Sequence, residues 1–156
     1  MREDVGAVVA AHPLFAGLPG PVADLVGSCA RNVALADGAL LLREGEPADT
    51  LYLIRRGTVS IEVHAPGRGP IVVEHVPAGH VVGWSWIVPP RVWHFDARAL
   101  GPVGAVAVDA QCLRDKATDD PAFGYQLMSR LFGIVVERLQ ATRVRLLDLY
   151  GPGSGG

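Results

Sequence analysis

The feature that most constrains the fold is a series of glycines that divides the middle of the chain into short apolar segments. Between residues 33 and 107 the apolar runs alternate with polar residues at a period of two, which is typical of strands joined by tight turns. Glycine suits such turns because it adopts positive φ without a Cβ penalty. The glycines concerned are Gly38, Gly45, Gly57, Gly67, Gly69, Gly79, Gly83 and Gly101. The pattern predicts a mainly β fold, a barrel or sandwich of short strands.

Two segments of this region can be assigned more closely. LYLIRRGTVSIEV, residues 51–63, has the pattern of a hairpin, and we expect its turn around Arg56 and Gly57. IVVEHV, residues 71–76, follows the loop APGRGP and predicts a further strand.

Helices are expected on both sides of the strands. Residues 5–11 predict a short helix that ends at His12-Pro13, because proline disfavours a helical conformation in the residue before it. A second helix should begin near Pro21, since proline suits a first helical turn. This helix would bury apolar side chains at helical spacing, namely Val22, Leu25, Val26 and Cys29.

A long helix is predicted at the C-terminal end of the domain. DAQCLRDKA, residues 109–117, indicates a short helix, and Asp120-Pro121 then provides an N-cap and a first-turn proline. The helix that follows carries an apolar stripe at steps of three and four, made of Met128, Leu131, Phe132, Val135, Leu139, Thr142, Leu146 and Leu149. Intramolecular packing and dimerisation both explain such a stripe, and we favour a homodimer through residues 121–149.

The composition indicates one globular domain. The chain has 156 residues, of which 49% are hydrophobic and 19% charged, and its formal net charge is −2. That charge provides no general attraction for nucleic acid. No segment reaches the roughly 18 apolar residues of a membrane span, so we expect a cytoplasmic protein. We assign residues 1–150 to the domain (N-terminal helices 4–32, strands 33–107, C-terminal helices 109–149) and 151–156 to a flexible tail.

The two cysteines do not form a recognisable motif. Cys29 and Cys112 are far apart in the sequence, without the short paired spacing of a zinc site or the density of a disulfide scaffold. We therefore expect two buried free thiols.

The order of glycines and apolar residues in LADGALLLREGEPADTLYLIRRGTVSIEV, residues 35–63, resembles the cyclic nucleotide-binding domain of catabolite activator-type regulators and protein kinase regulatory subunits. HPLFAGLP, residues 12–19, matches the usual N-terminal segment of that family, and the resemblance spans roughly residues 12–149. It implies a double-stranded β-helix (jelly-roll) barrel with N-terminal helices and a long C-terminal helix.

The resemblance also implies a ligand site. In the family, backbone N–H groups and one arginine hold the cyclic phosphate, and a glutamate binds the ribose hydroxyl. The matching segment here is GHVVGWSWIVPPRVWHFDA, residues 79–97, which we call the cassette. Arg91 matches the arginine and Gly83 the glycine before the glutamate, whereas Trp84 replaces the glutamate itself. An indole has one N–H donor and no carboxylate oxygens, so Trp84 cannot make the ribose contact.

The candidate ligand-binding residues are Val82, Gly83, Trp84, Ser85, Arg91, Val92, Trp93 and His94. The cassette departs from the family at three of these positions, since Trp93 stands in place of a small alanine and His94 in place of a small hydroxyl residue. We expect no obligatory cofactor, although a cyclic nucleotide or another anionic ligand is a candidate.

Two interpretations of the three indoles are open. In the first, Trp84, Trp86 or Trp93 stacks on a planar ligand while Arg91 holds an anionic group, which makes the protein a small-ligand sensor of changed specificity. In the second, the indoles fill the cavity and Arg91 pairs with a carboxylate such as Asp96 or stacks on a ring, which leaves a ligand-free interaction module. In both interpretations we expect Trp86 to be packed in the core.

Enzyme and metal chemistry are not indicated. The histidines at positions 64, 75, 80 and 94 form no close His-x-His pair, and Ser85 lacks a glycine-flanked nucleophile turn. Asp96 lies two residues after His94 on one strand, so the two side chains could meet. Catabolite activator-type regulators continue into a helix-turn-helix domain, whereas this sequence stops at Gly156. We expect no direct DNA binding and an output through a protein partner.

Overall fold

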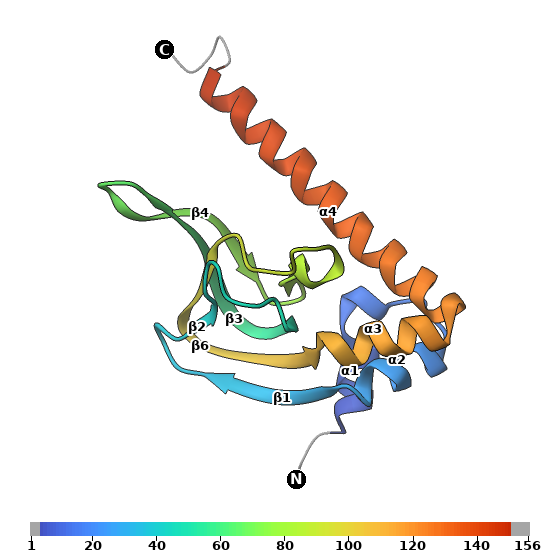
Figure 1. Cartoon of the computed structure of the whole chain (residues 1–156). Coiled ribbons are helices and arrows are strands. Elements are labelled where there is room, and N and C mark those ends of the chain that lie inside the picture. Colours follow the sequence, from blue (N-terminus) through green and yellow to red (C-terminus); the bar gives the residue numbers. More distant parts are fainter. Residues whose placement is uncertain (1–3, 151–156) are drawn as a thin grey trace.

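The computed structural model describes residues 4–150. A six-stranded antiparallel sheet forms the body, with helices gathered at one end and one long helix that extends beyond it (Figure 1). The elements in chain order are α1 (Val5–Ala11), η1 (Pro13–Phe15), α2 (Gly20–Gly27), β1 (Ala30–Leu35), β2 (Leu40–Leu42), β3 (Thr50–Ala65), β4 (Gly69–Pro77), β5 (Val81–Val82), η2 (Ser85–Ile87), β6 (Asp96–Asp109), α3 (Ala110–Asp119) and α4 (Pro121–Tyr150). The mainly β class with flanking helices is confirmed.

The sheet is organised around its two longest strands. The strand order is β1-β6-β3-β4, and the short strands β2 and β5 pair with β6 and β3 respectively. The inward side chains of β3 and β6 form the centre of the core, where Leu51, Leu53, Val59 and Val106 are fully buried. The N-terminal helices pack on the same core through Val9 and Val26 among others. The cassette includes β5, which pairs with β3, and ends in the first residues of β6.

The expected hairpin turn at Arg56 and Gly57 is wrong. β3 continues through this point, and its register against β6 shifts on either side of Arg56. Gly57 adopts φ +87, and a Cβ there would lie 2.5 Å from the Pro102 carbonyl oxygen. The glycine thus forms a bulge that bends one strand instead of reversing the chain. The reversal comes after Ala65, where β3 pairs with β4, so the strand predicted over residues 71–76 is confirmed.

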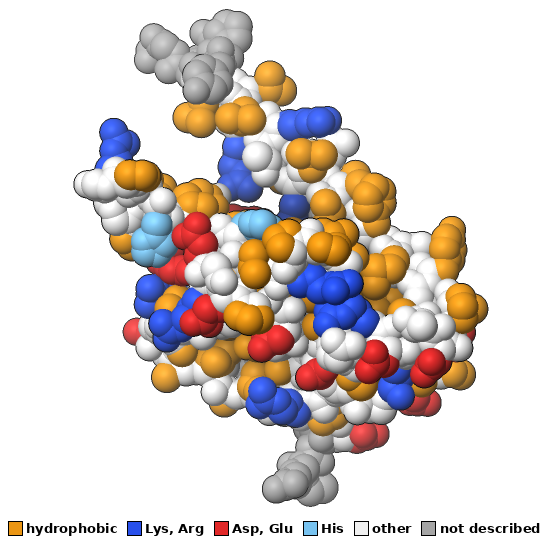
Figure 2. Space-filling view, in the orientation of Figure 1, with side chains coloured by type: hydrophobic (Ala, Val, Ile, Leu, Met, Phe, Trp, Pro, Cys, Tyr) orange, Lys and Arg blue, Asp and Glu red, His pale blue; other side chains and the backbone are white. Residues whose placement is uncertain are grey.

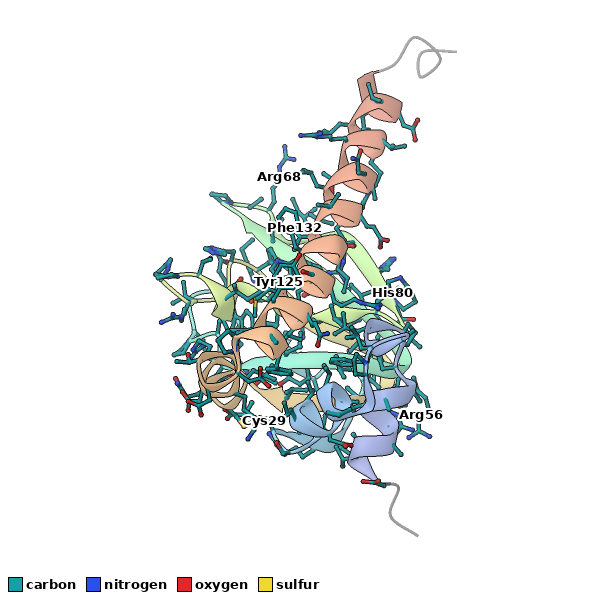
Figure 3. All side chains as sticks on the ribbon, turned by 90° about the vertical axis from the view of Figure 1, so that its right-hand side faces the viewer. Cys29, Arg56, Arg68, His80, Tyr125 and Phe132 are labelled. Atoms are coloured by element: carbon teal, nitrogen blue, oxygen red, sulfur yellow. A yellow bond between two sulfur atoms is a disulfide. The ribbon has the colours of Figure 1, made fainter. Side chains whose placement is uncertain are left out.

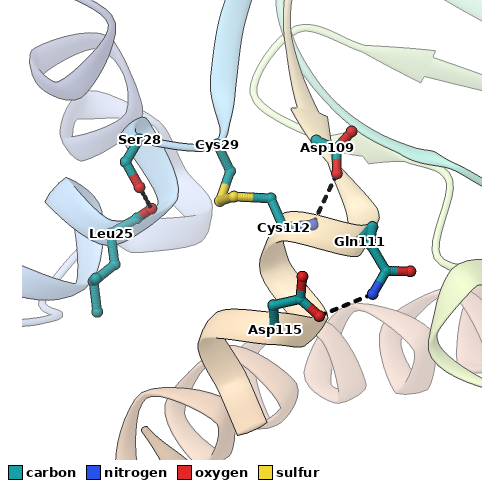
Figure 4. Close-up of a disulfide and its surroundings, with 7 residues drawn as sticks. All are labelled: Leu25, Ser28, Cys29, Asp109, Gln111, Cys112 and Asp115. Carbon is teal, nitrogen blue, oxygen red and sulfur yellow. Dashed lines mark hydrogen bonds between the residues drawn. A yellow bond between two sulfur atoms is a disulfide. The ribbon is translucent and has the colours of Figure 1, made fainter. Parts of the chain in front are cut away.

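The expectation of free thiols is also wrong, because Cys29 and Cys112 form a disulfide with a Cα–Cα distance of 5.7 Å (Figure 4). The strand register explains it. Ala30 of β1 pairs with Val108 of β6, and the Asp109 amide donates to the Cys29 carbonyl. α3 begins directly afterwards, so Cys112 in its first turn reaches the cysteine that precedes β1.

The long helix begins as predicted. The Asp120 side chain accepts a hydrogen bond from the Phe123 amide, at 3.2 Å, and Pro121 is the first residue of α4. Phe123, Leu127 and Leu131 are buried against the body. Beyond them α4 projects away from the barrel, on the opposite side of an open cleft from the β3–β4 hairpin (Figure 2). None of the helices within residues 4–150 combines the length and apolarity that a bilayer crossing requires.

Candidate functional site

The cassette contains a compact chain reversal that begins at Gly83. Gly83 follows β5 with φ +94, and the short helix η2 begins two residues later. The Trp86 indole N–H donates to the Gly83 carbonyl at 3.0 Å, which closes this turn from inside. Arg91 lies at the other end, after the cis bond between Pro89 and Pro90, with a left-handed φ of 54.

Two of the three indoles belong to the core. Trp86 is completely buried, as predicted, and Trp93 is 4% exposed. The Trp93 ring lies directly against Gly83, since a Cβ built on that glycine would be 2.9 Å from the ring's Cη2 atom. The same Cβ would be 2.9 Å from the Thr50 carbonyl oxygen. The inner side of the cassette glycine is therefore occupied by protein atoms.

The C-terminal part of the cassette is fixed by backbone hydrogen bonds to the loop after β2. The Gly45 amide donates to the Trp93 carbonyl at 2.9 Å, and the Trp93 amide donates to the Glu46 carbonyl at 3.0 Å. The Ala48 amide donates to the Arg91 carbonyl at 2.8 Å. These bonds set the direction of the Trp93 side chain, because they hold its backbone on both sides.

Arg91 and His94 point outward. Both residues are exposed, and neither side chain hydrogen-bonds or pairs with another residue of the described part of the chain. The pairing of Arg91 with Asp96 considered above is therefore wrong. The remaining candidate residues are Val82, buried in β5, and the half-buried Ser85 and Val92.

Asp96 instead pairs with a histidine of β3. His64 Nε2 lies 2.8 Å from Asp96 Oδ2, and the Glu44 amide donates to Asp96 Oδ1 at 2.8 Å. The hydrogen bond to Asp96 raises the pKa of His64. Burial alone would raise the pKa of Asp96, but its hydrogen bonds with Glu44 and His64 outweigh burial and lower it. Asp96, near the end of the cassette, thus pairs with His64 of β3 and not with His94.

Trp84, at the position of the family's glutamate, contacts the long helix. Its half-buried ring lies under the guanidinium of Arg138 on α4, with 4.5 Å between Cζ and the ring centroid. Arg138 also donates to the Val81 carbonyl and lies 3.6 Å from a Glu74 carboxylate oxygen. Arg114 of α3 donates to the Trp86 carbonyl at 3.0 Å. Sequence reasoning missed both arginines, because they lie far from the cassette along the chain and in no motif.

Two hollows lie on the outside of the barrel. A groove of about 770 Å³ runs between the β4–β5 region and α4, and Glu74, Val81 and Arg138 contribute to its walls. A second hollow of about 450 Å³ lies beside α1 and β3 and includes His12. Among residues 4–150 there is no group of three or more histidine, cysteine, aspartate or glutamate side chains placed to hold a metal ion.

Comparison with known proteins gives consistent matches. The family model for the cyclic nucleotide-binding domain matches residues 32–120. A CRP-like cAMP-activated global transcriptional regulator of Mycobacterium tuberculosis is 29% identical over 143 residues, which are 91% of this chain. The chain spans 62% of the length of that relative.

Solved structures agree with the same fold. A putative cyclic nucleotide-binding protein from Geobacter metallireducens superposes with a TM-score of 0.77 at 24% identity, and the superposition covers 89% of this chain and 99% of the other. A cyclic nucleotide-binding domain from Methylobacillus flagellatus gives 0.78 at 22% identity, with 93% and 82% covered. The N-terminal domain of a transcriptional regulator from Streptomyces coelicolor gives 0.67 at 25% identity, with 94% and 99% covered.

Proposed function

The chain belongs to the cyclic nucleotide-binding domain family, and from this premise we propose that it is a non-enzymatic regulatory domain whose nucleotide position is filled by its own Trp93. The fold is that of a ligand-sensing regulatory module. In our proposal the domain keeps the regulatory role and works without a bound cyclic nucleotide.

The contact between Trp93 and Gly83 carries this proposal. The family holds the cyclic phosphate on backbone N–H groups next to this glycine and has a small alanine at the position of Trp93. Here the indole is 4% exposed and lies against the glycine. Burial of an indole contributes about 4–6 kcal/mol at about 25 cal/mol per Å², which a ligand would have to replace in order to displace the ring.

The ribose side of the position supports the same conclusion. Trp84 lacks the carboxylate that would accept hydrogen bonds from a ribose hydroxyl. Its ring is already engaged by Arg138, with 4.5 Å between Cζ and the ring centroid. A nucleotide would therefore have to break a protein–protein contact here and receive no equivalent hydrogen bond in return.

A second function, the sensing of another anion, is favoured by one observation. Arg91 is exposed, matches the family's phosphate-binding arginine, and has no side-chain partner in the described part of the chain. An exposed guanidinium that has no partner within the protein can bind an anionic group from solvent. This alternative requires a ligand that contacts the outer side of the cassette and leaves Trp93 in place.

Calorimetric titration with cyclic AMP and cyclic GMP separates the two functions. We expect no saturable heat at millimolar nucleotide for the wild-type protein. Saturable binding that Arg91→Ala abolishes would contradict our proposal and favour the sensor. The double variant Trp84→Glu with Trp93→Ala restores both the carboxylate and the space, so we expect it to gain binding, and Trp84→Glu alone to gain none.

We also propose that the domain acts as a homodimer through α4 and signals to a protein partner in the cytoplasm. Three side chains of the predicted stripe are exposed along α4, namely Phe132 (69%), Leu139 (49%) and Leu146 (49%), and Tyr125 (76%), which the stripe did not include, is exposed one helical repeat before them. They recur every seven residues, as in a coiled-coil seam. Figure 3 labels Tyr125 and Phe132 on this helix.

Sedimentation velocity tests this assembly. Phe132→Glu places a charge in the seam and should convert the dimer to a monomer. Leu147→Glu changes an equally exposed leucine of the same helix that lies outside the seven-residue repeat, with 69% of its surface exposed. It should leave the dimer intact. A wild-type protein that sediments as a monomer at micromolar concentration would refute the dimer.

A further inference from the structure

We propose that Arg138, Trp84 and Glu74 form a clasp that keeps α4 docked on the cassette in the absence of any small molecule. The proposal rests on the proposed function, in which Trp93 fills the nucleotide position. It assigns to three side chains of the protein the link between cassette and long helix.

The clasp joins the long helix to two neighbouring segments of the barrel. Arg138 comes from α4, Trp84 from the cassette, and Glu74 from β4. The guanidinium stacks over the Trp84 ring at 4.5 Å, and its Nε lies 3.6 Å from Glu74 Oε1. One of its terminal nitrogens donates to the Val81 carbonyl, two residues before the cassette glycine. A single side chain of α4 thus contacts the cassette at two points, Val81 of β5 and Trp84, and the β3–β4 hairpin at Glu74.

The environment of Arg138 makes these contacts dependent on one another. Its side chain is 16% exposed, so the guanidinium is largely removed from water. Burial lowers the pKa of Arg138, and the charge of Glu74 opposes this effect. Removing a guanidinium from water costs free energy, which favourable interactions with the protein must offset. The attraction between the guanidinium and the face of an aromatic ring is one such interaction, and it is stronger when water is excluded. Loss of the Trp84 ring should therefore expel Arg138 from its site.

The position of the outer half of α4 depends on this attachment. Up to Leu131 the helix is held by buried apolar side chains, but residues 139–149 are all exposed. In this outer region a second arginine, Arg145, donates to the Val73 carbonyl at 2.7 Å and is itself exposed. Arg138 is consequently the last buried attachment before the helix leaves the barrel.

Hydrogen–deuterium exchange of α4, measured without nucleotide, tests the clasp. We expect peptides covering residues 135–149 to exchange at least about fivefold faster in Arg138→Gln and in Trp84→Leu, the effect of losing a partly desolvated cation–π pair. Arg143→Gln is the matched control, because it removes an exposed arginine of the same helix. This control should retain wild-type exchange.

The double variant completes a thermodynamic cycle. If the two side chains act as one unit, Arg138→Gln with Trp84→Leu should exchange no more than about twofold faster than either single variant. Peptides from β3 should be unchanged in all variants, which shows that the barrel is folded. Wild-type exchange of residues 135–149 in both folded single variants would overturn the clasp, and so would fully additive effects in the double variant.

The exchange experiment that tests the clasp and the nucleotide titration that tests the proposed function can fail independently of each other. Nucleotide binding by the wild-type protein would refute the filled site without changing exchange measured in its absence. Conversely, an unchanged α4 in the variants together with no nucleotide binding would refute the clasp and leave the proposed function in place.

Discussion

Removal of the disulfide should destabilise the domain through its effect on the unfolded chain. Cys29 and Cys112 enclose most of the β structure, with a sequence separation of 83. The bond also ties the residue before β1 to the first turn of α3 (Figure 4). The variant with both Cys29→Ser and Cys112→Ser allows the unfolded chain to expand, whereas the folded barrel keeps its strand pairing.

The magnitude follows from the size of the closed loop. For a separation of 83 the chain-entropy relation gives about 15 cal/mol/K, which is about 4.5 kcal/mol at 25 °C. Removal of native disulfides from small domains typically costs about 2–5 kcal/mol. A loss of about 4.5 kcal/mol lowers the melting temperature of a domain of this size by roughly 9–18 °C.

Urea denaturation of the oxidised wild type and the double serine variant measures both the free energy of unfolding and its denaturant dependence. The variant should lose about 2–5 kcal/mol, and its m-value should rise because its unfolded state exposes more surface. Wild-type protein unfolded in the presence of a reductant should follow the variant. A loss below about 1 kcal/mol with an unchanged m-value would refute the reasoning, because the bond would then constrain the unfolded chain very little.

Three further predictions concern Gly83, His64 and His12. Gly83→Ala should destabilise the fold by roughly 2–4 kcal/mol, because it combines positive φ with overpacking, whereas Gly45→Ala has positive φ and open space and should cost only about 1 kcal/mol by chemical denaturation. The pKa of His64 is raised by Asp96, so its contribution to stability is fully present below its ordinary pKa of 6.5 and is lost as the pH rises through the folded value. The free-energy difference between wild type and His64→Gln should therefore shrink between pH 6 and pH 8, and a constant difference would contradict this assignment. Burial lowers the pKa of His12, so stability dependent on this side chain is present above pH 6.5 and lost as the pH falls, and His12→Gln should reduce that loss.

The sequence allowed the order of the elements to be predicted because each has a local signal. Period-two segments, cap residues and the proline at position 121 are properties of a few neighbouring residues, and the structure places helices and strands accordingly. Gly57 was misjudged for a local reason as well. Positive φ serves a turn and a bulge equally, and only the close Pro102 carbonyl of β6 distinguishes them.

The disulfide could not be predicted because it depends on strand pairing. Ala30 faces Val108 across the sheet, and that register is absent from any local pattern. Likewise Asp96 has neighbours that are distant in sequence, since His64 comes from β3 and the Glu44 amide from the loop after β2. Long-range pairing is decided by the whole sheet, so residue spacing favoured His94 as its partner instead.

In the cassette, the sequence indicates that Trp84 replaces a glutamate, but it does not indicate which group the indole contacts. The resemblance places Trp84 where the family has a glutamate, and from the chemistry of an indole we expect this residue to make no ribose contact. In the structure the Trp84 ring contacts the guanidinium of Arg138, which lies 54 positions further along the chain. No sequence motif predicts how the helix that carries Arg138 packs on the cassette. The largely buried, planar guanidinium is stabilised by the face of the aromatic ring, and the ring packs against the guanidinium. In our proposal the two residues therefore act as one unit, in which a contact with a ligand is replaced by a contact within the protein.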